Sequence, residues 1–392
     1  MAASTAARVQ LVAGARPNYM KIAPIYWAIA EHARGSLDVE LLHTGQHYDA
    51  SMSDAFFREL HLPEPEVNLR VGSGSHAVQT ARIMAAYEEV LLERRPDVVI
   101  VVGDVNSTVA CALVATKIAY PETARRERPL VAHVEAGLRS RDRSMPEEVN
   151  RVVTDAISDR LFITCRDAEA NLVTEGIERS RISFVGNPMI DSLHRCLGEA
   201  ERSGLLEELG VEPGRFALCT LHRPSNVDRP AVLETILDAL SEAAAEFPLL
   251  LPLHPRTRQR IESFGLRERI AFLSRPVRQA PRRGLIGLEP LSYLEMLKAM
   301  QSSRAVFTDS GGIQEETTAL GIPCVTLRKN TERPITISEG TNVLAGVTRA
   351  GILDGFAEAE RKSRAGARVP ELWDGHAGRR IVEVLSRLTE VR

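Results

Sequence analysis

The sequence predicts an α/β protein built from two doubly wound domains. Short runs of aliphatic and β-branched residues alternate with longer helical patterns, and the runs are apolar throughout, which is typical of parallel strands buried on both faces. With 392 residues and a hydrophobic content of 44%, the chain can bury two cores. The alternation also restarts after an interruption near residues 187–192, where we place the linker.

Nine apolar runs account for the strands in order. The first domain has RVQLVA (8–13), VELLHTG (39–45), DVVIVVG (97–103), PLVAHVEAG (129–137) and RLFITC (160–165). The second has RFALCTLH (215–222), PLLLPLHP (248–255), RAVFTDS (304–310) and CVTLR (324–328). A last helical segment, RRIVEVLSRL (379–388), is apolar on one face and must therefore pack on other parts of the chain.

The composition argues against several classes of partner. Lysine and arginine number 49 against 52 acids, a formal net charge of −3, so nothing global attracts nucleic acid or an anionic membrane. No apolar run approaches the roughly 20 residues that span a bilayer, and the start of the chain lacks a cleavable signal pattern. Five scattered cysteines without a Cys-x-x-Cys pair disfavour disulfides and a zinc ribbon. We expect a cytoplasmic protein that binds no metal, nucleic acid or membrane.

Three acidic residues are candidates for acid–base chemistry, because ligands of doubly wound sheets bind beyond the carboxyl ends of the strands. Asp104 follows DVVIVVG, where it could also cap the next helix. Glu135 follows a buried strand beside small residues. Glu147 ends the stretch Ser144-Met145-Pro146-Glu147, which also fits a helix capping box. Together the three carboxylates favour proton transfer as their function.

Basic residues at strand ends are candidates for binding an anion. His222 and Arg223 follow the first strand of the second domain, where they could bind an anion or move a proton. His254 holds the comparable place after the next strand and is a weaker candidate. Arg16 and Lys21 flank the tight turn after the first strand, either as phosphate ligands or as solvated charge.

The stretch FTDSGGIQEE (307–316) predicts a diphosphate site. Ser310, Gly311 and Gly312 open a helix without bulky side chains, so its first amides can reach an anion; a close strand-to-helix turn is the alternative. Glu316 lies one turn deeper, roughly 5–6 Å along the helix axis.

Bound NAD is not expected. The stretch 72–77 fits the dinucleotide fingerprint G-x-G-x-x-A, but it follows a polar stretch, so a flexible loop that enters a helix explains it better. No tyrosine has a lysine four residues later, which removes the usual pair of nicotinamide-dependent sugar epimerases.

Taken together, the motifs resemble the non-hydrolysing UDP-N-acetylglucosamine 2-epimerase family. The likeness covers residues 8 to about 346 and follows family order through GARPNYMKIAPI, TGQHYD, VVGDVNST, HVEAGLRS, MPEEVNR, TLHRPSN, DSGGIQEE and TERPITISEGTN. It implies two Rossmann-like domains in a GT-B arrangement with the active site in the interdomain cleft, and a last helix that returns to the first domain. The domains would then comprise 1–187 with 372–392, and 188–371. A UDP-sugar substrate, no cofactor and a homodimer are also implied.

The resemblance further implies reversible epimerisation at carbon 2 of UDP-N-acetylglucosamine to UDP-N-acetylmannosamine. Family members eliminate UDP to give 2-acetamidoglucal and then add UDP back. Asp104, Glu135 and Glu147 look like the acid–base carboxylates, and His222 looks like the residue that serves the leaving UDP. The residues similar to UDP ligands, with Glu316 on the ribose, are Arg16, Lys21, Arg223, Ser310, Gly311, Gly312, Glu316 and Arg333. Glu315 receives no role.

The sequence departs from the family at positions that bear on the substrate. Pro224 and Ser225 stand where many members have an arginine and a glutamate, and Leu291 and Met296 where a glutamine and a phenylalanine are common. A UDP-2,3-diacetamido-glucuronic acid 2-epimerase and a GT-B glycosyltransferase with a UDP-sugar donor therefore stay as alternatives.

Overall fold

The computed structural model describes residues 6–46, 56–276, 281–366 and 368–390, without the side chains of Arg16 and Glu390. Residues 47–49 of the TGQHYD motif thus lie outside the described part. The chain divides into two compact units, Met1–His194 with Glu371–Arg392, and Arg195–Pro370. Residues 188–192, near which the sequence suggested a linker, form the first turns of helix α7 (Pro188–Glu201).

The first unit is built on one parallel sheet in the strand order β3-β2-β1-β4-β5-β6-β7. Every pairing between its described neighbours is parallel. Its strands are β1 (Ala7–Ala13), β2 (Leu37–His43), β3 (Val67–Asn68), β4 (Val98–Val102), β5 (Leu130–Val134), β6 (Arg160–Ile163) and β7 (Ile182–Phe184). All five residues of β4 are buried, as expected for a strand covered on both faces.

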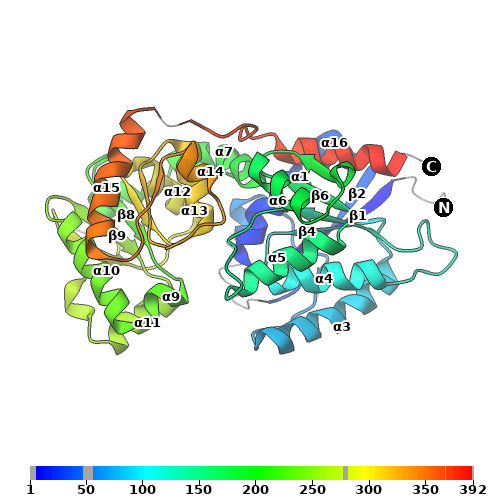
Figure 1. Ribbon diagram of the computed structural model, residues 1–392, viewed down its shortest axis with the longest axis horizontal. Coiled ribbons are helices and arrows are strands. Elements are labelled where there is room, and N and C mark those ends of the chain that lie inside the picture. Colours follow the sequence, from blue (N-terminus) through cyan, green and yellow to red (C-terminus); the bar gives the residue numbers. More distant parts are fainter. Residues whose placement is uncertain (1–5, 47–55, 277–280, 367, 391–392) are drawn as a thin grey trace. The chain divides into compact units, whose positions relative to one another are not determined.

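Helices cover both faces of this sheet (Figure 1). They are α1 (Arg16–His32), α3 (His76–Arg94), α4 (Asn106–Lys117), α5 (Pro146–Ile157), α6 (Arg166–Thr174) and α16 (Ala377–Glu390), whereas α7 begins in the first unit and ends in the second. α3, α4 and α5 pack side by side, and α16 lies along α1. The apolar face of α16 buries Ile381, Val382 and Leu385, and Gly378 approaches α1 so closely that a Cβ there would lie 2.4 Å from the carbonyl oxygen of Pro24.

The second unit has its own parallel sheet in the order β10-β11-β9-β8-β12-β13-β14. Its strands are β8 (Ala217–Thr220), β9 (Pro248–Pro252), β10 (Ala271–Phe272), β11 (Gly284–Leu288), β12 (Val306–Thr308), β13 (Cys324–Thr326) and β14 (Asn342–Leu344). Its helices are α8 (Leu205–Leu209), α9 (Pro224–Val227), α10 (Pro230–Ala243), α11 (Pro255–Ser263), α12 (Tyr293–Ser302), α13 (Gly311–Leu320), α14 (Ile335–Ser338) and α15 (Arg349–Arg364). α12, α13 and α14 form one group of neighbours, and α10 with α15 another.

Local sequence signals explain where the helices begin and end. Ser75 caps α3 by accepting a hydrogen bond from the amide of Val78, so residues 72–77 form a loop that enters a helix, as predicted. α13 ends at Gly321, whose φ of 71° gives the left-handed conformation that glycine adopts easily.

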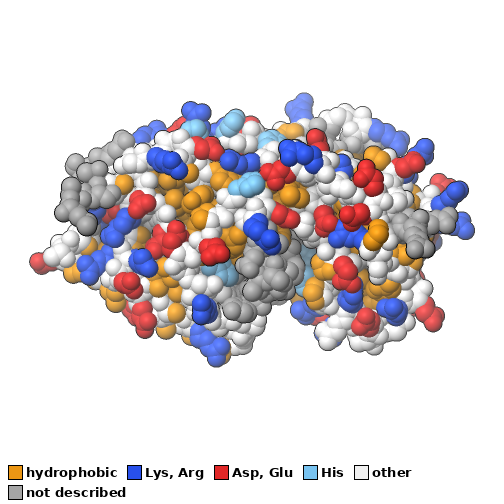
Figure 2. Space-filling view, turned by 180° about the vertical axis from the view of Figure 1, so that it is seen from behind, with side chains coloured by type: hydrophobic (Ala, Val, Ile, Leu, Met, Phe, Trp, Pro, Cys, Tyr) orange, Lys and Arg blue, Asp and Glu red, His pale blue; other side chains and the backbone are white. Residues whose placement is uncertain are grey.

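The predicted fold class is confirmed, since both units are doubly wound, Rossmann-like parallel sheets between helices. The nine predicted strands correspond to β1, β2, β4, β5, β6, β8, β9, β12 and β13. The prediction missed five strands, namely β3, β7, β10, β11 and β14. Among the described residues, no helix combines the length and the apolar character needed to cross a membrane. Basic and acidic side chains are interspersed on the face shown in Figure 2.

Candidate active site

Strands β1, β4 and β5 are neighbours in the first sheet, so the segments that follow them meet at one edge. The turn after β1 is fixed by Asn18, whose side-chain oxygen accepts hydrogen bonds from the amides of Gly14 and Ala15. The Asn18 amide group also donates to the carbonyl of Val102, the last residue of β4. This turn starts α1 and places Lys21 on its first turns.

Lys21 and Glu135 form a buried ion pair. The Lys21 Nζ lies 2.7 Å from the Glu135 Oε2, and the two side chains are 6% and 2% exposed. Glu135 follows β5 with a φ of 70°, which is unusual for a residue with a side chain. A Cβ at Gly103 would lie 2.9 Å from the Lys21 Nζ and 3.8 Å from the Glu135 Oε1, so only glycine leaves room for this pair at the end of β4. Two predicted site residues are therefore in direct contact.

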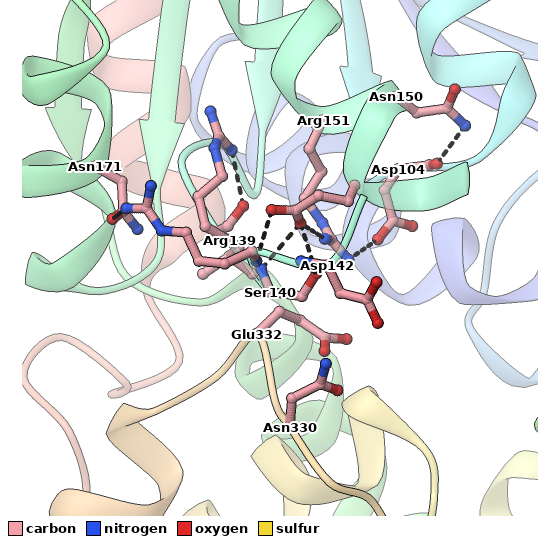
Figure 3. Close-up of polar contacts among 12 residues, drawn as sticks. Asp104, Arg139, Ser140, Asp142, Asn150, Arg151, Asn171, Asn330 and Glu332 are labelled. Atoms are coloured by element: carbon pink, nitrogen blue, oxygen red, sulfur yellow. Dashed lines mark hydrogen bonds and ion pairs between the residues drawn. The ribbon is translucent and has the colours of Figure 1, made fainter. Parts of the chain in front are cut away.

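Asp104, the next residue, is bound by an arginine that the sequence analysis did not single out. Its Oδ2 accepts a hydrogen bond of 2.5 Å from Arg151 of α5, and Figure 3 shows this contact beside the one from the Asn150 amide to the Asp104 carbonyl. Arg151 is 2% exposed and also donates to Glu148. Asp104 thus has a buried cation as its partner, as Glu135 does.

The capping box expected at Ser144–Glu147 is not formed. Met145 holds the N-cap position of α5 and has no side-chain cap hydrogen bond. The Ser144 hydroxyl donates instead to Asp142, which also accepts the Ser144 amide. Pro146 stands in the first turn as predicted. Helix capping therefore does not explain the presence of Glu147 at the next position. Glu147 is half-buried in the first turn of α5.

In the second unit, His222 is oriented by Asp309. The two residues follow the adjacent strands β8 and β12. The His222 Nδ1 lies 2.8 Å from the Asp309 Oδ1, and the amides of His222 and Arg223 donate to the same carboxylate. Although burial by itself would raise the pKa of Asp309, the charge of His222 and these hydrogen bonds hold it below its ordinary value. Asp309 is therefore a carboxylate that holds the loop after β8 in place.

The guanidinium group of Arg333 lies at the glycine-rich start of α13. A Cβ at Gly311 would lie 2.5 Å from the Arg333 Nη1 and 2.9 Å from its Cζ, so the space that glycine leaves there is filled by a guanidinium group. Ser310 holds the N-cap position, and Ser310, Gly311 and Gly312 are all half-buried. The diphosphate site at this helix start stays a prediction, and the Arg333 guanidinium brings a positive charge to the same helix end.

Arg333 belongs to a buried group of charges. It pairs with Glu315 (Nε to Oε2, 3.0 Å) and with Glu332 (Nη1 to Oε1, 2.7 Å). Glu332 also contacts Arg328 at 2.8 Å and Arg223 at 3.4 Å. Burial alone would raise the pKa of Glu332, but the three arginines hold it well below its ordinary value. Glu315, which the motifs left without a role, holds Arg333.

Glu316 is fully buried on α13, and its Oε1 accepts a hydrogen bond of 3.1 Å from the hydroxyl of Tyr293. Burial raises its pKa to about 8. A carboxyl group with this pKa is largely protonated at neutral pH and can donate as well as accept a hydrogen bond. His254, the weaker candidate, accepts the amide of Arg256 and caps α11.

The structure thus joins the predicted residues into three groups, Lys21 with Glu135, His222 with Arg223, and Arg333 with Gly311. It adds Arg151, Asp309 and Glu332, which the sequence analysis missed. Asp309 ends the predicted strand run RAVFTDS, and Arg151 and Glu332 lie in the motifs MPEEVNR and TERPITISEGTN, but one sequence does not show which residues these three contact. Within the described ranges, no group of three or more acidic, histidine or cysteine side chains could hold a metal ion.

Comparisons with known proteins identify the family of the chain. The sequence model of the UDP-N-acetylglucosamine 2-epimerase family matches residues 30–386. A UDP-N-acetylglucosamine 2-epimerase of Methanocaldococcus jannaschii is 37% identical over 385 residues, covering 97% of this chain and 99% of the relative. A UDP-2,3-diacetamido-2,3-dideoxy-D-glucuronate 2-epimerase of Pseudomonas aeruginosa is 39% identical over 388 residues, covering 97% and 100%.

Solved structures show the same likeness. The crystal structure of the M. jannaschii UDP-GlcNAc 2-epimerase in complex with UDP-GlcNAc and UDP superposes with a TM-score of 0.84 at 38% identity, and the match covers 97% of this chain and 99% of that one. The agreement therefore extends over both units and is not confined to the motifs. The chain belongs to the UDP-N-acetylglucosamine 2-epimerase family and is an epimerase, hence an isomerase.

Proposed function

We propose that this protein interconverts UDP-N-acetylglucosamine and UDP-N-acetylmannosamine by eliminating UDP and adding it back. The observation that carries the proposal is the pair of carboxylates, Asp104 and Glu135, that follow the adjacent strands β4 and β5, each with a buried cation beside it. Ionised carboxylates at the binding edge of a doubly wound sheet suit proton transfer to and from a bound sugar. The family and the M. jannaschii relative support the same reaction.

In the proposed reaction the C2–H bond and the C1–O bond to UDP break, giving 2-acetamidoglucal and UDP. UDP then returns to C1 while a proton is delivered to C2 from the opposite face. Acid–base groups are needed on both faces of the sugar, and we assign this work to Asp104, Glu135 and Glu147. The three differ in surroundings: Glu135 and Asp104 contact cations, whereas Glu147 lies half-buried at the start of α5.

The departing diphosphate needs positive charge. We assign it to the start of α13, where the helix amides of Gly311 and Gly312 and the guanidinium of Arg333 come together, with Arg223 and His222 in support. Around Glu332 the charges of three arginines exceed those of Glu315 and Glu332, leaving one net positive charge. Glu316 is assigned to the ribose hydroxyls, and Arg16 and Lys21 to the phosphates.

A second substrate is favoured by one observation. The P. aeruginosa relative that acts on a UDP-diacetamido-glucuronate is 39% identical, at least as similar as the M. jannaschii UDP-N-acetylglucosamine 2-epimerase at 37%. The two candidates share the elimination chemistry and differ in the sugar that must be bound. Parallel assays with both UDP-sugars discriminate between them, because the true substrate should show the higher kcat/KM.

The deciding experiment is proton NMR of the purified protein with UDP-N-acetylglucosamine in deuterated water and no acceptor. We expect the UDP-N-acetylmannosamine signals to grow, deuterium to enter at C2 of both sugars, and free UDP not to accumulate. A recovered UDP-sugar without deuterium would refute the proposal. Steady release of UDP with free N-acetylmannosamine would instead indicate a hydrolysing enzyme. Equilibration without an acceptor would exclude a glycosyltransferase.

A further inference from the structure

His133 is a buried histidine that the proposed reaction does not use directly. It lies in β5, two residues before Glu135, and is 0% exposed. Both nitrogens of its ring have close partners: the Nδ1 lies 2.6 Å from the Asp155 Oδ1, and the Nε2 lies 2.8 Å from the carbonyl oxygen of Gly103. A histidine kept only for packing does not require a polar partner on each side of its ring.

These partners determine the protonation state of the ring. The Gly103 carbonyl can only accept a hydrogen bond, so the Nε2 must carry a proton. Asp155 accepts the amide of Gly137 at 3.0 Å and pairs with Arg139 at 2.8 Å through its second oxygen. The guanidinium of Arg139 favours the ionised form of this carboxyl group, and an ionised Asp155 can only accept from the Nδ1. A ring that donates from both nitrogens is an imidazolium.

The pKa of Asp155 is consistent with an ionised carboxylate. Burial would raise the pKa of Asp155, but His133 and Arg139 hold the pKa below its ordinary value. Two further charged groups belong to this network: Arg139, on the segment after β5, contacts Asp155, and Glu175, at the end of α6, binds Arg139 through both oxygens. The four charges of His133, Asp155, Arg139 and Glu175 compensate one another.

The ion pair of His133 and Asp155 holds the backbone on both sides of the candidate carboxylates. The ring holds the carbonyl of Gly103, whose φ is 66° and which directly precedes Asp104. Asp155 holds the amide of Gly137, two residues after Glu135. Glu135 itself has a φ of 70°, a conformation that persists only where the surroundings impose it. One buried pair therefore fixes the chain at the ends of both strands.

We propose that His133 is a positioning residue, held as an imidazolium by Asp155, which sets the backbone of Gly103 and Gly137 so that Asp104 and Glu135 are aligned for proton transfer. The inference rests on the proposed function of these two carboxylates. It predicts that loss of the ion pair lowers kcat while binding of UDP, to which neither His133 nor Asp155 is assigned, stays close to the wild-type level.

Nitrogen-15 NMR of protein labelled at its histidines tests the charge state without any substrate. One histidine of the wild-type protein should carry protons on both ring nitrogens, because the Nδ1 and the Nε2 of His133 each face an acceptor. His133→Gln should remove this signal. Asp155→Asn should convert it to that of a neutral ring with one proton. A wild-type spectrum that contains no doubly protonated ring removed by His133→Gln would overturn the proposal.

Kinetics test the positioning role. For His133→Gln we expect kcat to fall about 100-fold, the loss that a displacement near 1 Å can cause, with KM and UDP affinity little changed. His194→Gln, a change of the same kind at an exposed histidine of the first unit, should leave kcat unaltered. If His133→Gln does not fold, Asp155→Asn provides the same comparison.

The two experiments separate the possible failures. A variant that has lost the imidazolium signal but retains the wild-type kcat would overturn the positioning role. A wild-type protein that shows the signal and yet leaves C2 unlabelled in deuterated water would refute the proposed function and not the ion pair. A kcat that falls together with a large loss of UDP affinity would show a general structural role and would also overturn the proposal.

Discussion

Glu135→Gln should destabilise the first unit strongly, because it leaves the ammonium of Lys21 buried without its carboxylate. The two charges lie 2.7 Å apart with exposures of 6% and 2%. At an effective dielectric constant of about 20, their attraction amounts to about 6 kcal/mol, and desolvation offsets part of it. Removing one partner of a buried pair typically costs about 3–5 kcal/mol. For a unit of this size, that loss lowers the Tm by roughly 6–20 °C.

The assay is a double-mutant cycle on thermal and urea unfolding, with Lys21→Met, Glu135→Gln and both changes together. We expect each single variant to lose stability and the double variant to recover much of the loss, with a coupling of about 3 kcal/mol between the two sites. Glu371→Gln, which opens the exposed pair with Arg166, is the matched control and should leave the Tm within the scatter of the measurement. Losses that simply add in the double variant would refute the buried ion pair.

Three further predictions follow from the second unit. Burial raises the pKa of Glu316 to about 8, so its proton stabilises the fold fully below pH 4.5, and this contribution is lost as the pH rises through 8. The unfolding midpoint should therefore decline less between pH 5, 7 and 9 in Glu316→Gln than in the wild-type protein. Asp309→Asn should cost about 2 kcal/mol in urea unfolding and lower turnover, because an amide cannot accept all the bonds of the carboxylate; an unchanged midpoint would contradict this. Gly311→Ala should weaken UDP binding in calorimetry by displacing Arg333, whereas Gly198→Ala, a helix position with open space, should not.

How much the sequence could predict depends on the length of each pattern. β4 has five consecutive buried residues and stands out as an apolar run. β3 and β10 have only two residues each. β7 and β14 have three, as β12 and β13 do, but most residues of β7 and β14 are half-buried, whereas those of β12 and β13 are all buried. β11 has five residues, but GLIGL contains two glycines, which are depleted in strands.

In the candidate site, too, some features could be predicted from the sequence and others could not. That Asp104, Glu135 and His222 would follow strands at a binding edge could be predicted, because position after a parallel strand is a local property. Their partners could not, since Arg151 lies 47 residues after Asp104 and Asp309 lies 87 residues after His222. Gly311 shows most clearly what one sequence cannot predict. A glycine at a helix start indicates that space is left there, but not whether a ligand or a side chain from another segment fills it.

The ion pair between Lys21 and Glu135 also links two roles that the sequence assigned separately. Lys21 was assigned to the phosphates and Glu135 to proton transfer, yet the two side chains lie 2.7 Å apart and form one ion pair. An ammonium that turns part of its charge toward a diphosphate stabilises the neighbouring carboxylate less, and the carboxylate then holds a proton more readily. When UDP leaves the sugar, its new negative charge would act on Lys21 at the same moment. If Lys21 and Glu135 have the proposed roles, departure of UDP and proton transfer at Glu135 are coupled through Lys21, and Lys21→Met should impair both steps together.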